Sequence, residues 1–170
     1  IRDQEAAKIA IEAALTGHLV LSTLHTNDAP TAITRLVEMG IEPFLVASAV
    51  DCVVAQRLAR MLCGHCKKPR TVAKAVLQDH GFDHAEDIEA FDPGGCSRCG
   101  GSGYKSRIGV YEVMSVSDEI RNLAIERAPA DRIAAVAMRD GMRSLREDGF
   151  DKVLDGRTSI AEIARVTGTG

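Results

Sequence analysis

The stretch Thr16-Gly17-His18-Leu19-Val20-Leu21-Ser22-Thr23-Leu24-His25-Thr26-Asn27 decides how the fold is interpreted. Its apolar run shows no helical period and lies between Gly17 and a polar segment. Such a run is typical of a strand that is covered on both faces in a parallel sheet. We therefore expect a strand over residues 18–24 that ends at His25.

Helical patterns flank this expected strand on both sides. Residues 5–15 place several apolar side chains on one helical face, and Gly17 follows as a stop. Residues 26–30 supply capping side chains and a proline for a first turn, which opens a second helix that Gly40 ends. The order helix, strand, helix indicates an α/β fold.

The rest of the chain is predicted to be mainly helical around one polar insert. An apolar pattern predicts a buried helix over residues 43–60. A short helix near residues 71–79 and a strand over residues 108–116 follow. Ser159 and Glu162 form a capping-box signature. Four more helices are expected, over residues 118–127, 130–140, 142–154 and 159–166.

Four of the five cysteines form two C-x-x-C pairs, Cys63 with Cys66 and Cys96 with Cys99. Each pair has the spacing that tetrahedral Zn²⁺ requires, so together they predict a closed, structural four-sulfur site. Disulfides and a thioredoxin-like site are weaker alternatives, because the cysteine count is odd and the pairs flank a polar insert. Cys52 is expected to be a small buried hydrophobe. Three histidines are expected to be exposed bystanders: His65, His80 and His84.

The composition indicates a globular protein and argues against nucleic acid as a partner and against a membrane span. The chain has 170 residues, of which 45% are hydrophobic and 26% charged, as in a globular protein with one sizeable core. A net charge of −3, 4% aromatic residues and no Trp argue against a nucleic-acid partner. The longest apolar stretch, residues 44–55, is shorter than the roughly 20 residues of a membrane span. No transmembrane segment is expected.

His25 lies where the expected strand ends and the next helix begins. Open α/β sheets bind ligands at this edge, and a helix N-terminus favours an anion, so His25 is a candidate for positioning a phosphate or a water. The alternative is structural: Asn27 and Asp28 cap the helix while His25 makes an ordinary hydrogen bond. The residues by themselves leave both interpretations open.

One glycine-rich stretch resembles the end of a phosphate loop without being one. In Gly101-Ser102-Gly103-Tyr104-Lys105-Ser106, Tyr104 stands where the loop needs Gly before Lys. These glycines are better explained by a tight turn around a metal-bound thiolate. The chain opens on Ile1 without an initiator Met, so we expect a fragment whose phosphate loop precedes residue 1.

Together these motifs resemble the type II secretion and type IV pilus assembly ATPase family of bacteria. Residues 16–27 are similar to the family's histidine box. Ile1-Arg2-Asp3-Gln4-Glu5 is similar to the segment after the family's Walker B glutamate. The four cysteines also fit and favour the assembly and secretion branch over the pilus retraction relatives. Three further segments match: residues 42–45, 55–58 and 148–153.

The resemblance implies an architecture and an activity. The chain would be the C-terminal part of a RecA-like, parallel-sheet NTPase core (residues 1–60), with an inserted zinc module (61–107) and a return strand with C-terminal helices (108–170). The parent would be a cytoplasmic homo-hexamer on the inner membrane. It would use ATP and Mg²⁺ to assemble pilin or pseudopilin subunits together with membrane platform proteins.

The resemblance also implies roles for individual residues. His25 and His18 are expected near the γ-phosphate, Arg2 as a catalytic and nucleotide-binding charge, and Arg107 as a second nucleotide-binding charge. Because the chain holds neither the phosphate loop nor the Walker B glutamate, it is expected to be inactive alone. The glycines after Cys99 suggest the alternative of a zinc-ribbon binding module, either chaperone-like or nucleic-acid-binding.

Overall fold

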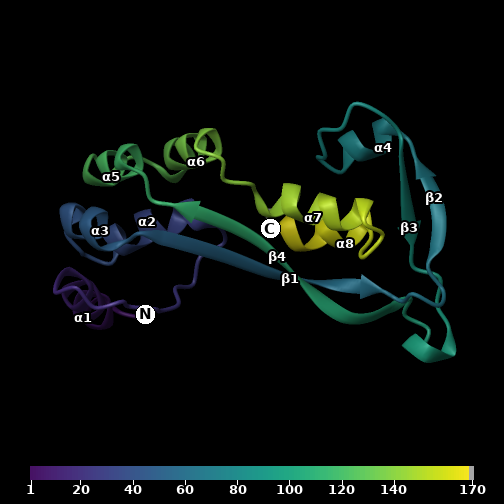
Figure 1. The fold of residues 1–170 in the computed structure, drawn as a ribbon, viewed down its shortest axis with the longest axis horizontal. Coiled ribbons are helices and arrows are strands. Elements are labelled where there is room, and N and C mark those ends of the chain that lie inside the picture. Colours follow the sequence, from purple (N-terminus) through teal and green to yellow (C-terminus); the bar gives the residue numbers. More distant parts are fainter. Residues whose placement is uncertain (169–170) are drawn as a thin grey trace. The chain divides into compact units, whose positions relative to one another are not determined.

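The computed structural model describes residues 1–168 as a mixed α/β chain, drawn in Figure 1. The chain divides into two compact units. The first unit comprises Ile1–Ala55 with Glu112–Arg143, and the second comprises Gln56–Tyr111 with Ser144–Gly170. Two long strands, β1 (Cys52–Leu62) and β4 (Tyr104–Ser115), pair with one another and contribute residues to both units.

The first unit is a cluster of helices. In it α3 packs against α1, α2 and α5, and α6 packs against α2 and α5. Its core is made of aliphatic side chains that are almost fully buried, among them Ile33, Val46, Met114, Ile120 and Ile133. The helices are α1 (Gln4–Leu15), α2 (Ala29–Glu38), α3 (Pro43–Ala49), α5 (Asp118–Ile125) and α6 (Ala130–Arg139).

Local capping residues explain where α1 and α2 begin and end. Asp3 Oδ1 accepts the backbone N–H of Ala6 at 2.8 Å, and Asp28 Oδ1 accepts that of Thr31 at 2.8 Å. Each carboxylate serves one of the N–H groups that a helix leaves without an internal partner. Gly40, with φ of +88°, ends α2 as predicted, because this left-handed conformation is cheap only for glycine.

The second unit combines a small sheet with three α-helices and one 3-10 helix. Strands β2 (Lys68–Val72) and β3 (Ile88–Asp92) pair antiparallel, with Arg70 opposite Ala90. The rings of Phe82 and Phe150 stack with centroids 5.1 Å apart. The remaining elements are α4 (Lys74–Asp79), the 3-10 helix η1 (Ser97–Cys99), α7 (Leu145–Leu154) and α8 (Ile160–Thr167). Its buried core includes Ala59, Val72, Leu77, Val110, Val153 and Ile163.

The predicted strand over residues 18–24 is wrong. Residues 18–26 belong to no helix or strand, and Leu19 and Leu21 are 88% and 86% exposed. A strand exists only where a neighbouring strand pairs with its backbone, and no strand within residues 1–168 pairs with this segment. The N-terminal amino group of Ile1 donates to the carbonyl oxygen of Thr23 at 2.6 Å, but this single bond does not make a strand. The apolar side chains of residues 18–24 favour burial, but no part of residues 1–168 covers Leu19 and Leu21.

The predicted helix over residues 43–60 is confirmed as far as Ala49 and is wrong beyond it. Helix α3 ends at Ala49, and β1 begins at Cys52, which is exposed rather than buried. A continuous apolar run cannot be assigned to helix or strand by its period alone, and the β-branched residues Val50, Val53 and Val54 favour extended backbone. Pairing with the distant strand β4 decides the outcome.

The other predicted elements are confirmed, with small shifts at their ends. Helices α5, α6, α7 and α8 lie within the four predicted C-terminal segments to within about a turn, and α4 lies in the predicted residues 71–79. Strand β4 starts earlier than predicted, at Tyr104. Within residues 1–168, every helix is too short or too polar to cross a bilayer.

The compact units interleave segments of the chain, whereas the sequence predicted three consecutive parts. The predicted division into residues 1–60, 61–107 and 108–170 follows from the resemblance to the ATPase family. A grouping of residues by their contacts does not test that division. It stays a prediction.

Candidate functional site

The four paired cysteines form one cluster in the second unit. Their sulfur atoms all lie within 4.8 Å of one another, and no disulfide joins them. Cys63 and Cys96 are 3.9 Å apart, and both Cys66 and Cys96 lie 3.8 Å from Cys99. Four sulfurs at about 2.3 Å from Zn²⁺ in a tetrahedron are about 3.8 Å from each other. The predicted cluster is therefore confirmed as a group that can hold a metal ion.

Backbone N–H groups surround the sulfurs. Gly95 donates to Cys66, and both Cys96 and Gly103 donate to Cys99, each with an N···S distance of 3.2 Å. The N–H of Cys96, with that of Gly103, lowers the pKa of Cys99 to about 6. Loss of water raises the pKa of Cys66 to about 11. A metal binds thiolates, so these N–H groups favour the charge state that binding requires.

Glycines allow the chain to close around the cluster. A Cβ on Gly94 would lie 1.9 Å from the carbonyl oxygen of Cys66, and one on Gly103 would lie 2.4 Å from Cβ of Pro93. Gly103 also has a φ of +77°. The glycines after Cys99 thus form the turn around a thiolate that the sequence indicated, and not a phosphate loop.

None of the nearby histidines belongs to the metal-ligand group found among residues 1–168. His65 is exposed, and its Nε2 lies 2.6 Å from Nη1 of Arg98. His80 is exposed as expected, but His84 is half-buried rather than exposed, because its ring packs against Phe150 with centroids 5.5 Å apart. The four cysteines are therefore the candidate ligand set.

The segment carrying His25 is an exposed turn directly before α2. We call residues 25–28 the histidine turn. His25 is exposed, while Asp28 at the end of the turn caps the helix. The buried side chain of Glu112 accepts the backbone N–H of Ala29, the first residue of α2, at 2.7 Å. The turn is thus joined to a helix N-terminus that two carboxylates hold.

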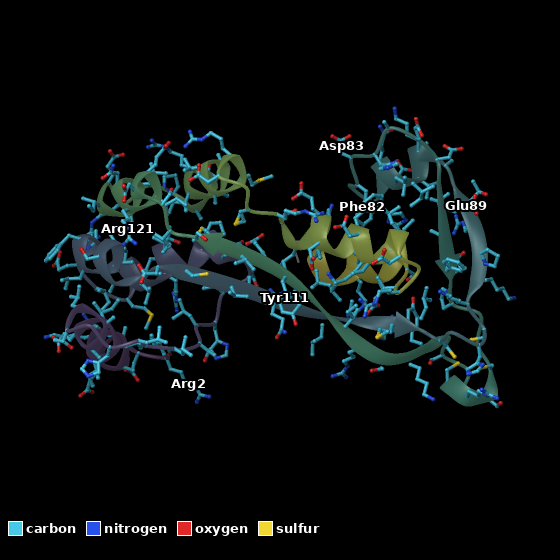
Figure 2. The ribbon with its side chains drawn as sticks, viewed as in Figure 1. Arg2, Phe82, Asp83, Glu89, Tyr111 and Arg121 are labelled. Atoms are coloured by element: carbon cyan, nitrogen blue, oxygen red, sulfur yellow. The ribbon has the colours of Figure 1, made fainter. Side chains whose placement is uncertain are left out.

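The structure places the remaining predicted residues on the surface. Arg2 is exposed and points away from the ribbon (Figure 2). His18 Nδ1 lies 3.1 Å from the Thr16 hydroxyl and 3.3 Å from the carbonyl oxygen of Ala13, at the C-terminal end of α1. Within residues 1–168, the side chains of His25 and Arg2 have no polar partner. Unlike the cysteines, these residues are not brought into one hydrogen-bonded group.

Arg107 lies in the second unit, on β4. Its side chain is exposed, and it follows Ser106, whose φ of 73° is unusual for a residue other than glycine. A residue in this conformation bends a strand and changes the direction of the side chains beside it. Arg107 therefore belongs to a different compact unit from His25 and Arg2, which lie in the first unit.

Sequence reasoning missed two buried carboxylates. Glu112 was detectable, because alternation along the predicted strand puts it on the same inward face as Met114, where a carboxylate needs a partner. Glu162 was detected only as half of a capping box. Ser159 does accept its N–H at 3.3 Å, but the carboxylate turns to two arginines instead of the backbone of Ser159.

Glu162 is the centre of an ion-pair cluster. Its side chain is fully buried and accepts Arg60 Nη2 and Arg165 Nη2, each at 2.7 Å, as well as the backbone N–H of Arg60 at 2.9 Å. The guanidinium of Arg60 lies 4.2 Å from the centre of the Tyr104 ring. Burial alone would raise the pKa of Glu162, but the bonds from Arg165 and Arg60 outweigh it and hold the pKa at about 2. The cluster attaches α8 to β1.

A cavity of about 280 Å³ lies in the first unit. Its lining is mainly apolar, with Ile33, Val37 and Ile133 beside Glu38 and Arg127. None of the predicted site residues lines it.

Comparison with known proteins identifies the family. A sequence model described as "Type II/IV secretion system protein" matches residues 1–165. The chain belongs to this family. The type IV pilus assembly ATPase PilB of Thermus thermophilus is 49% identical over 165 residues, which are 96% of this chain and 19% of that protein. Type II secretion system protein E of Aeromonas hydrophila is 46% identical over 167 residues, which are 98% of this chain and 33% of that protein.

Solved structures show the fold. The pilus retraction motor PilT with bound ADP covers 99% of this chain and 38% of its own, with a TM-score of 0.64 and 21% identity. The ATPase DotB of Legionella pneumophila covers 98% of this chain and 36% of its own, with a TM-score of 0.62 and 18% identity. The α/β fold and the family predicted from the sequence are confirmed. The chain spans less than 40% of each of these four relatives.

Proposed function

We propose that this chain is the C-terminal part of a hexameric ATPase that drives pilin or pseudopilin assembly in type II secretion or type IV pilus biogenesis. The observation that carries the proposal is its 44–49% identity, over nearly its whole length, to relatives named as pilus assembly ATPases or type II secretion proteins. The motor works at the cytoplasmic face of the inner membrane, docked on membrane platform proteins.

The histidine turn is the phosphate-facing edge of this motor. A helix N-terminus carries partial positive charge and favours phosphate oxygens, and α2 begins directly after the turn. His25 and His18 act near the γ-phosphate, and Arg2 adds a charge that grips phosphate oxygens through its planar donors. The exposure of His25 and Arg2 leaves both accessible to a nucleotide. Mg²⁺, when bound with ATP, neutralises charge on the phosphates.

Zn²⁺ is the metal that suits the cysteine cluster. Four thiolates at tetrahedral spacing complete its coordination, so the ion is structural and has no position for substrate. The ion stabilises the second unit, and that unit carries Arg107, the second nucleotide-binding charge. Folding of the metal centre thereby supports the strand on which Arg107 lies.

ATP hydrolysis by the full-length protein tests this function. We expect magnesium-dependent turnover by the full-length ATPase and none by residues 1–170, because this sequence contains no phosphate loop. His25→Ala in the full-length protein is expected to lower kcat by at least about tenfold. His80→Ala is the matched control, since that histidine is also exposed and lies in the second unit.

Two results would contradict the proposal. One is strong magnesium-dependent hydrolysis by residues 1–170 alone. The other is a full-length protein that does not hydrolyse ATP at all.

A further inference from the structure

Glu112 forms the longest-range anchor of the α2 N-terminus. It lies on β4, 83 positions from Ala29, and its Oε1 accepts the Ala29 N–H at 2.7 Å. The residue is only 6% exposed. A carboxylate in such a place is costly unless it finds strong donors. The start of a helix supplies both an unpaired N–H group and positive dipole charge, so the pairing satisfies both partners.

Two carboxylates at this helix start do different things. Asp28 accepts the N–H of Thr31 within a single turn, a contact that an isolated helix can also make. Glu112 comes from a strand in the core of the unit, beside the fully buried Met114. Its bond therefore determines where in the unit the helix begins, and not only whether the helix forms.

The position of the helix start determines the position of the histidine turn. His25 precedes Ala29 by four residues, and its own side chain has no polar partner within residues 1–168. The intervening segment leads into the cap at Asp28 and the Glu112 bond to Ala29. If the helix start shifts, nothing in the contacts of His25 itself would hold the histidine in place.

We infer that Glu112 is a positioning residue for His25: it touches no nucleotide, but it fixes the helix start from which the histidine turn extends. The inference rests on the proposed function of His25. It predicts that loss of the Glu112 bond slows the chemical step through His25 and leaves nucleotide binding nearly unchanged.

A double-mutant cycle in the full-length ATPase tests this. Glu112→Ala is expected to lower kcat about tenfold with KM for ATP within about twofold, as for a group that acts only in the transition state. Glu112→Gln keeps an oxygen that accepts the Ala29 N–H, and is expected to retain at least about half of kcat. Combined with His25→Ala, Glu112→Ala should cause no further loss, because the group that it positions is already absent.

Ser144→Ala is the matched control for a lost helix cap. Ser144 caps α7 in the second unit by accepting the Glu147 N–H at 3.2 Å, so the variant loses a comparable bond at the start of a different helix. We expect its kcat to stay within about twofold of the unaltered enzyme. If Glu112→Ala does not fold, as judged by circular dichroism, Glu112→Asp takes its place in the cycle. Its shorter side chain withdraws the carboxylate, so the same coupling to His25 is expected.

The outcomes separate this inference from the proposed function. Unchanged kcat in the Glu112 variants, a Gln variant as slow as the Ala variant, or losses that multiply with that of His25→Ala would each overturn the positioning role. If His25→Ala still slows the enzyme in those cases, the proposed function stands. An unaltered full-length protein without ATP hydrolysis would overturn the proposed function, and this inference with it.

Discussion

The cysteine cluster and the histidine turn are opposite kinds of site. The cluster is closed: four sulfurs face one another, and backbone N–H groups such as those of Gly95 and Gly103 point at them. The histidine turn is open: His25 is exposed, and Glu112 anchors the first residue of the helix that follows the turn. A structural ion needs a complete shell, whereas a group that meets a substrate must stay accessible.

This difference predicts whether a substitution at each site changes stability or activity. Damage to the closed cluster should appear in the free energy of unfolding of the second unit. Loss of the exposed His25 side chain should appear in activity and hardly in stability.

Removing the metal should have the largest effect. Structural Zn²⁺ in small domains contributes about 10 kcal/mol or more, so chelation from the zinc-loaded protein should abolish amide-exchange protection over residues 63–103. Protection of α2 in the first unit should persist. Hydrogen exchange by mass spectrometry, with one zinc per chain in metal analysis, measures both. Cys99→Ser should act like chelation, and Cys52→Ser, at an exposed cysteine outside the cluster, should not. Equal protection before and after chelation would contradict the closed-site interpretation.

Loss of the buried carboxylate of Glu162 should have the second-largest effect on stability. The folded pKa of about 2 lies below the ordinary 4.5, so the stabilisation is present above pH 4.5 and is lost as the pH falls towards 2. The difference corresponds to at most about 3 kcal/mol. Glu162→Gln should lower the free energy of unfolding by about 2–3 kcal/mol at pH 7 and flatten its decline between pH 4.5 and 2.

Urea unfolding at pH 7 and pH 3 measures this change. Glu126→Gln is the control, because that carboxylate is exposed in a long ion pair of 4.0 Å and should matter by less than about 0.5 kcal/mol. An unchanged acid transition in the Glu162 variant would show that other groups govern it.

Close packing between α7 and α8 predicts a smaller loss. A Cβ on Gly149 would lie 2.6 Å from Cγ2 of Ile163. Gly149→Ala should therefore destabilise by about 1–3 kcal/mol, despite the better helix propensity of Ala. Gly64→Ala, where no atom lies within 4 Å, should change stability by less than about 0.5 kcal/mol. Thermal unfolding of both variants measures these losses. An equal loss of stability in the two variants would mean that α7 and α8 can move apart at little cost.

The smallest effect is expected at the histidine turn. His25→Ala should change the free energy of unfolding by less than about 0.5 kcal/mol, because an exposed side chain without partners contributes little. Asp28→Ala, which removes the cap on Thr31, should cost about 1 kcal/mol in the same urea titration. A loss above about 1 kcal/mol for His25→Ala would favour the structural role that the sequence left open.

Local chemistry made much of this protein predictable from its sequence. The helices start at Asp3, Asp28, Ser144 and Ser159 because each side chain caps an N–H only three residues ahead. The cysteine cluster was predictable because each C-x-x-C pair presents two sulfurs in one turn. Such contacts depend on spacing along the chain, which a sequence states directly.

Tertiary structure decided the rest. The apolar segment at residues 52–62 became a strand because β4 pairs with it, and residues 18–24 did not because no strand within residues 1–168 pairs with them. The partners of Glu112 and Glu162, 83 and 102 positions away, were likewise beyond local reasoning. A sequence states which groups need a partner, but the partner of a strand or a buried charge is chosen by whichever distant segment the fold brings beside it.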